Sequence, residues 1–170
     1  QPDRLGRMLW RVDGNTNTLR WTYATNSFWR LAEILDARSN RTSWAYDRYG
    51  NPTNRTYADS SSESIQYNHR NQPVRRVSSG GIVTSNAYDA NGNMTYVWRG
   101  LEPAVTFAYD PLNQCTQMVD AVGTNRWTYD ARGRVTSEAN PWGAATPELR
   151  YDGVGRMTQI VFGAWSMALA

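Results

Sequence analysis

The stretch Tyr129-Asp130-Ala131-Arg132-Gly133-Arg134-Val135 decides the fold, because related stretches recur throughout the 170-residue chain. Its pattern is a tyrosine, an acid or amide, two free positions, a glycine or asparagine, a polar residue and an apolar residue. We call this pattern the tyrosine phrase and number its positions 1 to 7. Phrases begin near residues 2, 23, 46, 67, 88, 109, 129 and 151, a spacing of about 21 residues. A fixed period of this length is typical of a repeat architecture.

Positions 2 and 5 of the phrase carry the chemistry of a tight turn. Glycine and asparagine at position 5 readily adopt a left-handed backbone with positive φ. An aspartate or asparagine at position 2 can accept hydrogen bonds from the turn's own backbone. We therefore expect a three-residue hairpin loop closed by a bulge, and only Ser27 breaks the pattern. The expected structural turn residues are Asp3, Gly6, Asp47, Gly50, Asn71, Asp89, Gly92, Asp110, Asn113, Asp130, Gly133, Asp152 and Gly155.

Position 1 is expected to pack against position 7, because the turn places position 2 opposite position 6. Position 7 is apolar in the clear repeats, for example Pro52 and Val135, as cross-strand pairing on a buried face requires. One rung further from the turn, a small residue should face a threonine on the other side of the sheet, as Ala45 would face Thr53. The tyrosines expected to form the structural core are Tyr46, Tyr67, Tyr88, Tyr109, Tyr129 and Tyr151.

The strands that lead into each phrase have a period of two. A large apolar residue stands two places before the tyrosine, as in Trp44 and Trp127, with a small residue between them. The segments between phrases have turn and loop compositions. This pattern predicts an all-β fold, an antiparallel meander of about eight β-hairpin repeats in a single array over residues 1–170. The stretch from Thr25 to Ala37 is the one place where we expect a short helical insertion.

Composition narrows the function classes. The chain is 40% hydrophobic, which is enough to bury a sizeable core. The net charge is +3 and the pI is about 9.2, values that could indicate nucleic-acid binding. The basic residues are scattered arginines, however, and several of them face a turn aspartate, so we expect no nucleic-acid binding. Cys115 is the single cysteine, which excludes an intrachain disulfide framework, and we expect a buried thiol beside Tyr109. The apolar tail from Ile160 to Ala170 is too short to span a bilayer.

No constellation of side chains points to catalysis. The turn aspartates recur because the turn needs them, so we do not interpret any two of them as a general acid and base. His69 is the only histidine and occupies a free turn position. Without a second histidine or a cysteine pair, we expect no metal site, no cofactor and no enzyme activity. Exposed aromatic rings can bind sugars or other flat ligands, and Trp142, in a loop after a proline, is the best candidate for such a contact.

The phrase and its spacing, clearest in Tyr151-Asp152-Gly153-Val154-Gly155-Arg156, resemble the Rhs/YD-repeat family over essentially the whole chain. The resemblance implies a long sheet of hairpins that curves or spirals into a hollow shell. In bacterial members, which include polymorphic toxins and the C component of insecticidal toxin complexes, the shell encloses a toxic C-terminal domain. In the animal teneurins a similar barrel belongs to an adhesion receptor. The self-cleavage segment of some members, rich in Tyr-Asp-Pro-x-x-Gly-Arg-Phe, is not in this chain.

Two functions of different classes follow from these patterns. The first is a structural segment of a secreted or cell-surface bacterial protein, forming part of an encapsulating shell around a C-terminal toxin or other cargo. Its partners would be the remainder of its own polypeptide, an enclosed toxin domain, or further copies associating through open sheet edges. The alternative is a cell-surface adhesion or carbohydrate-binding module that uses exposed aromatics. Because polar capping units are lacking, we expect the chain to be a fragment of a longer polypeptide.

Overall fold

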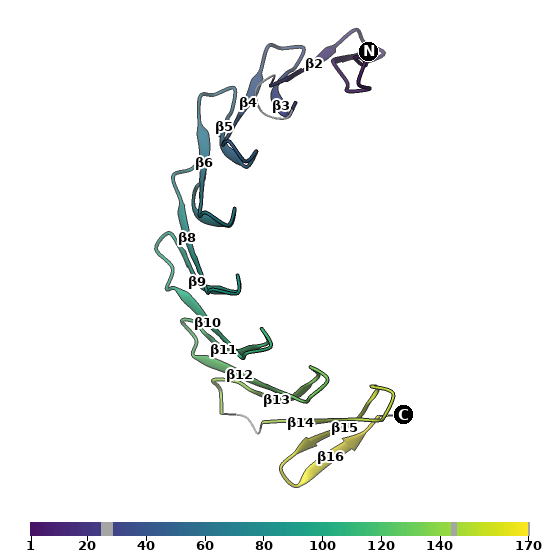
Figure 1. Cartoon of the computed structure of the whole chain (residues 1–170), viewed down its shortest axis with the longest axis vertical. Helices are drawn as coiled ribbons and strands as arrows, with labels where there is room; N and C mark the ends of the chain where they lie inside the picture. Colours follow the sequence, from purple (N-terminus) through teal and green to yellow (C-terminus); the bar gives the residue numbers. More distant parts are fainter. Residues whose placement is uncertain (25–28, 144–145, 170) are drawn as a thin grey trace. The chain divides into compact units, whose positions relative to one another are not determined.

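The structure is a computed structural model, and it describes residues 1–24, 29–143 and 146–169. In these ranges sixteen β-strands lie in one sheet, and strands adjacent in sequence are adjacent in the sheet (Figure 1). The all-β meander of hairpins predicted from the sequence is confirmed. The strands are β1 (Trp10–Val12), β2 (Thr18–Tyr23), β3 (Leu31–Leu35), β4 (Arg41–Tyr46), β5 (Pro52–Thr56), β6 (Ser62–Tyr67), β7 (Pro73–Val77), β8 (Val83–Tyr88), β9 (Met94–Arg99), β10 (Val105–Tyr109), β11 (Cys115–Val119), β12 (Thr124–Tyr129), β13 (Val135–Ala139), β14 (Glu148–Tyr151), β15 (Met157–Phe162) and β16 (Trp165–Ala168).

The chain divides into two compact units, Gln1–Ser85 and Asn86–Ala170. In the first unit, tyrosine phrases join β2 to β3, β4 to β5 and β6 to β7, and each pair is antiparallel. In the second unit, phrases join β10 to β11, β12 to β13 and β14 to β15 in the same way. Further antiparallel ladders join one hairpin to the next. Between these strands the chain reverses in turns at the ends opposite to the tyrosine phrases, which we call the distal turns.

The helical insertion expected between Thr25 and Ala37 is wrong for the described part of that stretch. Leu31–Leu35 is strand β3 and pairs with β2, with Trp21 opposite Ile34. This segment therefore adds a strand to the sheet, and its Ile34 lies on the same face as Trp21. Residues 25–28, and with them Ser27 of the doubtful second phrase, lie outside the described residues.

The second phrase has a longer loop than the others. The N–H of Ala24 donates to the carbonyl oxygen of Arg30 at 2.8 Å, and Trp29 has a positive φ of 56°. Tyr23 lies opposite Leu31. Trp29, Arg30 and Leu31 thus take positions 5, 6 and 7, two residues later than in the clear phrases. This extra length accounts for the step of 23 residues between Tyr23 and Tyr46.

The pairing expected one rung beyond the tyrosine is also wrong. Tyr46 lies opposite Pro52, but Ala45 pairs with Asn54 and not with Thr53. The register shifts at the same place in five further phrases, so the residue after position 7 is the extra residue of a second bulge. This residue is a threonine in four of the six phrases, and Ala32 or Val74 in the other two. A threonine suits this site because its hydroxyl can reach the facing strand, as Thr116 Oγ1 does when it donates to the Ala108 carbonyl oxygen at 3.3 Å.

The sheet has no fully buried hydrophobic core. No hydrophobic side chain in the described ranges is buried, and the six phrase tyrosines expected in the core are half-buried. The core expected from composition is absent from these residues, because a single layer packs only against its own neighbours and a core needs a second layer. We call the face that carries the tyrosines the aromatic face. It also carries Trp21, Trp44 and Ile65 in the first unit, and Phe107, Trp127 and Leu149 in the second.

Candidate functional site

The turn of the tyrosine phrase is a fully hydrogen-bonded unit, which Asp130 illustrates. Its N–H donates to the carbonyl oxygen of Arg134 at 2.9 Å, and its own carbonyl oxygen accepts the N–H of Gly133 at 2.9 Å. Its carboxylate accepts the backbone N–H groups of Arg132 and Arg134 and also Nε of Arg134 at 2.6 Å. Position 5 has positive φ in each described phrase with this loop length: Gly6 (76°), Gly50 (86°), Asn71 (61°), Gly92 (95°), Asn113 (63°), Gly133 (79°) and Gly155 (97°).

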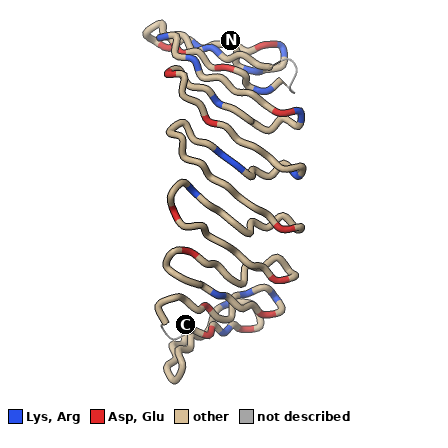
Figure 2. The backbone as a smooth tube through the Cα atoms, turned by 90° about the vertical axis from the view of Figure 1, so that its left-hand side faces the viewer, with Lys and Arg blue, Asp and Glu red and all other residues tan. Residues whose placement is uncertain are grey.

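These bonds favour the ionised form of the Asp130 and Asp152 carboxylates. The side-chain hydrogen bond from Arg134 holds the pKa of Asp130 below its usual value, and Arg156 does the same for Asp152. A carboxyl group with a lowered pKa is a poor proton donor near neutral pH. The repeated aspartates therefore stabilise turns, and Figure 2 shows charged residues at the tips of many of the hairpins.

We expect the melting temperature of the chain to fall as the pH drops below about 4, the ordinary pKa of aspartate. The pKa of Asp130 is lowered in the folded state, so its contribution to stability is present above the unfolded pKa and is lost as the pH falls through the folded pKa. Thermal unfolding followed between pH 7 and pH 2 measures this loss. An Asp130→Asn variant should be less stable at pH 7 and should lose less stability in acid. An unchanged acid slope in this variant would mean that Asp130 does not contribute.

The distal turns that begin at Asp13 and Asp36 repeat the same geometry, which the sequence did not reveal because their position 5 residues are threonine and serine. Thr16 and Ser39 have positive φ values of 64° and 66°. Asp13 accepts Nδ2 of Asn17 at 2.8 Å, and Asp36 accepts Nδ2 of Asn40 at 2.8 Å.

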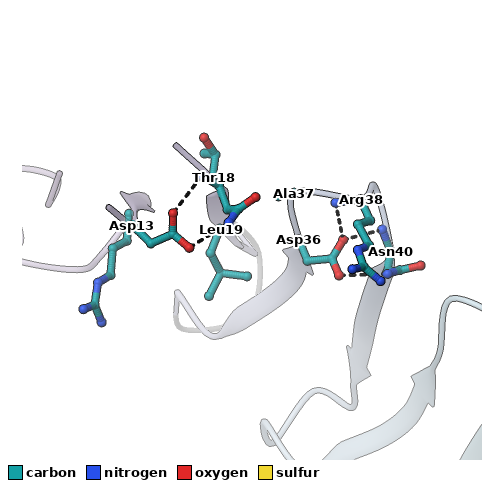
Figure 3. Close-up of a pocket in the computed structure, with 9 residues that line it drawn as sticks. Asp13, Thr18, Leu19, Asp36, Ala37, Arg38 and Asn40 are labelled. Atoms are coloured by element: carbon teal, nitrogen blue, oxygen red, sulfur yellow. Dashed lines mark hydrogen bonds between the residues drawn. The ribbon is translucent and has the colours of Figure 1, made fainter. Parts of the chain in front are cut away.

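A cavity of about 480 Å³ lies between these two distal turns, and Arg11, Leu19 and Arg38 contribute to its lining (Figure 3). The carboxylates of Asp13 and Asp36 are occupied by hydrogen bonds within their own turns. No group of three or more histidine, cysteine or carboxylate side chains in the described ranges is placed to hold a metal ion. Within those ranges there is also no helix long and apolar enough to cross a membrane.

Six of the phrase tyrosines also bind the preceding hairpin through their hydroxyl groups, and this role was not predicted from the sequence. The ladder between β5 and β6 pairs Asn54 to Thr56 with Ser62 to Ser64, so it stops short of Pro52. The Tyr67 hydroxyl donates to the Pro52 carbonyl oxygen at 3.0 Å, which lies beyond the ladder. We call this bond the tyrosine staple. It also joins Tyr23 to Met8 (3.0 Å), Tyr46 to Leu31 (2.7 Å), Tyr109 to Met94 (2.9 Å), Tyr129 to Cys115 (2.6 Å) and Tyr151 to Val135 (2.7 Å).

The signal for the staple is the use of tyrosine and not phenylalanine at position 1. A partly buried tyrosine hydroxyl normally finds a hydrogen-bond partner. Burial raises the pKa of Tyr46, Tyr67, Tyr109 and Tyr129 above the usual value, so these hydroxyls remain protonated donors at neutral pH.

Position 6 provides a second link between neighbouring hairpins. Where it is arginine, the guanidinium lies over the next phrase tyrosine. The Arg134 guanidinium carbon is 4.5 Å from the centroid of the Tyr151 ring, and that of Arg7 is 4.7 Å from the centroid of the Tyr23 ring. Such cation–π contacts add to stability. A phrase is therefore coupled to the next through both its position 6 and its position 7.

The residue at position 6 also lies close to position 5 of the next phrase in some repeats. A Cβ atom at Gly133 would lie 2.8 Å from Nε2 of Gln114, so the end of that side chain would have to shift. Where position 6 is the shorter asparagine, as in Asn51, position 5 of the next phrase can also be asparagine. Oδ1 of Asn71 accepts a hydrogen bond from Nδ2 of Asn51 at 2.8 Å. Asn93 and Asn113 form the same bond at 2.8 Å.

The remaining candidates from the sequence lie apart from this network. Trp142 is 75% exposed, and its backbone N–H donates to Oδ1 of Asn140 at 3.1 Å. His69 is exposed in its turn. Cys115 lies opposite Tyr109 but is only half-buried, so the expectation of a buried thiol is wrong for the same reason as the expectation of a core. The structure brings none of these three residues together.

Residues 109–146 match the family described as RHS Repeat. The chain is 27% identical over 142 residues to the double-stranded DNA deaminase toxin A of Burkholderia cenocepacia (strain H111), and the match covers 82% of this chain and 10% of that protein.

The fold is shared with solved toxin-complex structures. A mutant Tc holotoxin pore from Photorhabdus luminescens matches with a TM-score of 0.66 and 17% identity, over 87% of this chain and 9% of that one. A TcdB2–TccC3–Cdc42 structure matches with a TM-score of 0.70 and 14% identity, over 99% of this chain and 11% of that one. The chain thus spans about a tenth of the length of these relatives.

The single sheet, the repeated turn and the staples define a structural repeat protein in which neighbouring hairpins are joined by strand pairing and side-chain hydrogen bonds. The resemblance of this chain to the Rhs/YD-repeat family is confirmed by the family match, the toxin relative and the shared fold.

Proposed function

We propose that this chain is a stretch of β-shell that encloses a C-terminal toxin or another cargo, within a longer secreted or cell-surface bacterial polypeptide. The observation that carries the proposal is the aromatic face. Its tryptophans and tyrosines are only half-buried in a single-layer sheet. An extended apolar surface of this kind marks an interaction site, and an enclosed polypeptide would cover it. The names of the similar proteins, a toxin and components of toxin complexes, support this assignment.

The tyrosine staples favour a structural role for the chain over a catalytic one. Neighbouring hairpins are joined by a strand ladder and, at six phrases, by a tyrosine staple, as Tyr67 and Pro52 illustrate in the first unit. In repeat proteins, stability is the sum of the units and of the contacts between nearest neighbours. An array of this kind can therefore be lengthened without a new core and keep its rigidity. We propose that the chain itself has no enzymatic role.

A photo-crosslinking experiment tests the enclosure. A benzophenone amino acid is placed at Ile65, which lies on the aromatic face, or at Gln66, its neighbour on the opposite face, in the polypeptide that contains this chain. We expect crosslinks from position 65 to a segment beyond the repeats, and none from position 66. Crosslinks from position 66 alone, or from neither position, would contradict the proposal.

Exposed tryptophans favour one alternative, a module for carbohydrate binding or cell-surface adhesion. Trp142 is 75% exposed and Trp165 is 82% exposed. If Trp142 forms such a site, the chain should bind selectively on a glycan array, and Trp142→Ala should abolish the binding while Trp165→Ala retains it. Binding at background level for all three proteins would leave the shell as the function.

A further inference from the structure

In the first unit, the aromatic face carries an arginine that is held in place by two rings. Arg55 lies on β5, opposite Trp44. Its guanidinium carbon is 5.3 Å from the Trp44 ring centroid and 4.6 Å from the Tyr57 ring centroid, and the residue is exposed. A guanidinium stacked in this way keeps its planar N–H edge available for a carboxylate, which it can bind through two parallel hydrogen bonds.

The nearest carboxylate is already occupied by other groups. Glu63 lies opposite Arg55 on β6. Its Oε2 accepts Nη2 of Arg76 at 3.1 Å, and its Oε1 accepts the Tyr57 hydroxyl at 2.9 Å. Within the described ranges, no hydrogen bond or ion pair joins the Arg55 guanidinium to an acceptor. The charge of Arg55 does act on Glu63, but no hydrogen bond joins the two side chains, so the N–H groups of Arg55 remain available to a second carboxylate.

An apolar hollow lies directly beside this arginine. It has a volume of about 140 Å³ and is lined by Trp44, Pro52, Asn54, Arg55, Glu63 and Ile65. A cavity of about 150 Å³ accommodates benzene, so the hollow is large enough for one apolar side chain. The site thus pairs a place for an apolar group with a fixed cation at its edge.

The charge of the surrounding unit favours an acidic ligand. Residues 1–85 contain twelve arginines and seven carboxylates, a net charge of +5, although the whole chain carries only +3. A surface with excess positive charge attracts acidic partners and accelerates their association.

We infer that Arg55 and the adjacent hollow bind an extended polypeptide segment in which an apolar side chain stands next to a carboxylate. The apolar side chain fills the hollow between Trp44 and Ile65, and the carboxylate accepts both N–H groups of the Arg55 edge. The inference rests on the proposed function for the source of that segment, which is the cargo. The same site on the isolated chain can be tested without any cargo.

The test uses the 170-residue chain and two fluorescein-labelled peptides, one with repeated Leu-Asp pairs and one with Leu-Asn in their place. Fluorescence anisotropy measures the two dissociation constants. We expect the Leu-Asp peptide to bind at least tenfold more tightly, and Arg55→Gln to abolish that preference. Arg48→Gln is the matched control, because Arg48 also stacks on a tyrosine ring, that of Tyr49, but lies in the exposed turn. Glu63→Gln, which releases Arg76, should tighten binding of the acidic peptide.

Equal affinity for the two peptides, or a preference that survives Arg55→Gln, would overturn the site. Comparison with the crosslinking experiment separates the two proposals. Peptide preference without crosslinks from position 65 would retain the site and reject enclosure, whereas crosslinks without peptide preference would do the reverse. Circular dichroism of each variant confirms that a loss of binding is not a loss of fold.

Discussion

Replacing Gly133 with valine is expected to lower the free energy of unfolding of this chain by about 2 kcal/mol. Gly133 has a φ of 79°, a left-handed conformation that is costly for a β-branched side chain. The new Cβ would also lie 2.8 Å from Nε2 of Gln114, so the end of that side chain would have to shift. The substitution therefore strains its own turn and disturbs the link to the preceding one.

Chemical denaturation measured on the wild type and on two valine variants tests this expectation. Gly153→Val is the matched control, because Gly153 stands in the next tyrosine phrase without positive φ and with open space around its Cβ position. We expect the control to change stability by less than about 0.5 kcal/mol. Equal effects of the two substitutions would show that the left-handed turn does not determine the stability of this hairpin.

The location of the damage is as informative as its size. In a repeat array each unit contacts its nearest neighbours, so a local defect raises the opening of adjacent units first. Amide hydrogen exchange in Gly133→Val should accelerate in β12 and β13 and in their direct neighbours β11 and β14. Uniform acceleration across the chain would indicate a single cooperative unit instead.

The local features of the fold were predictable because they depend on residues close in sequence. The turn around Asp130 and Gly133 and the pairing of Tyr129 with Val135 follow from rules of backbone conformation and strand alternation. The pairing of the residue that follows position 7, Thr136 in this phrase, was not predictable in this way. Alternation alone places Thr136 opposite Thr128, whereas the second bulge makes Ser137 the partner, and no residue type marks a bulge of this kind unambiguously.

Features that join different hairpins were harder to predict. The composition indicated a core, yet a single-layer sheet leaves the aromatic face half-exposed, and composition cannot report the number of layers. The match between position 6 of one phrase and position 5 of the next, as in Asn51 with Asn71, involves residues 20 positions apart. Such a pairing becomes visible only when consecutive phrases are compared as neighbours in space. The Arg55 site was missed for the same reason, because it combines three different strands.

Removal of a single staple hydroxyl by Tyr129→Phe is expected to destabilise the chain by about 1 kcal/mol. The ring keeps its packing, but the carbonyl oxygen of Cys115 loses the hydroxyl that lies 2.6 Å from it. The ladder between β11 and β12 involves Gln117 to Val119 and does not include Cys115, so it provides no replacement donor for the Cys115 carbonyl oxygen. The loss therefore falls on the junction between two hairpins and leaves the turn of Asp130 intact.

The measurement is again denaturation, combined with hydrogen exchange, and Tyr49→Phe is the control. Tyr49 is 55% exposed at a turn tip, and its hydroxyl accepts Nη2 of Arg48 at 2.6 Å without joining two hairpins. We expect this control to stay within about 0.5 kcal/mol of the wild type. Faster exchange confined to β11 and β12 in Tyr129→Phe would locate the staple between hairpins. If Tyr129→Phe matched the control, the rigidity of the array would have to come from the strand ladders and the contacts of position 6, and the repeated tyrosine would be explained by its ring.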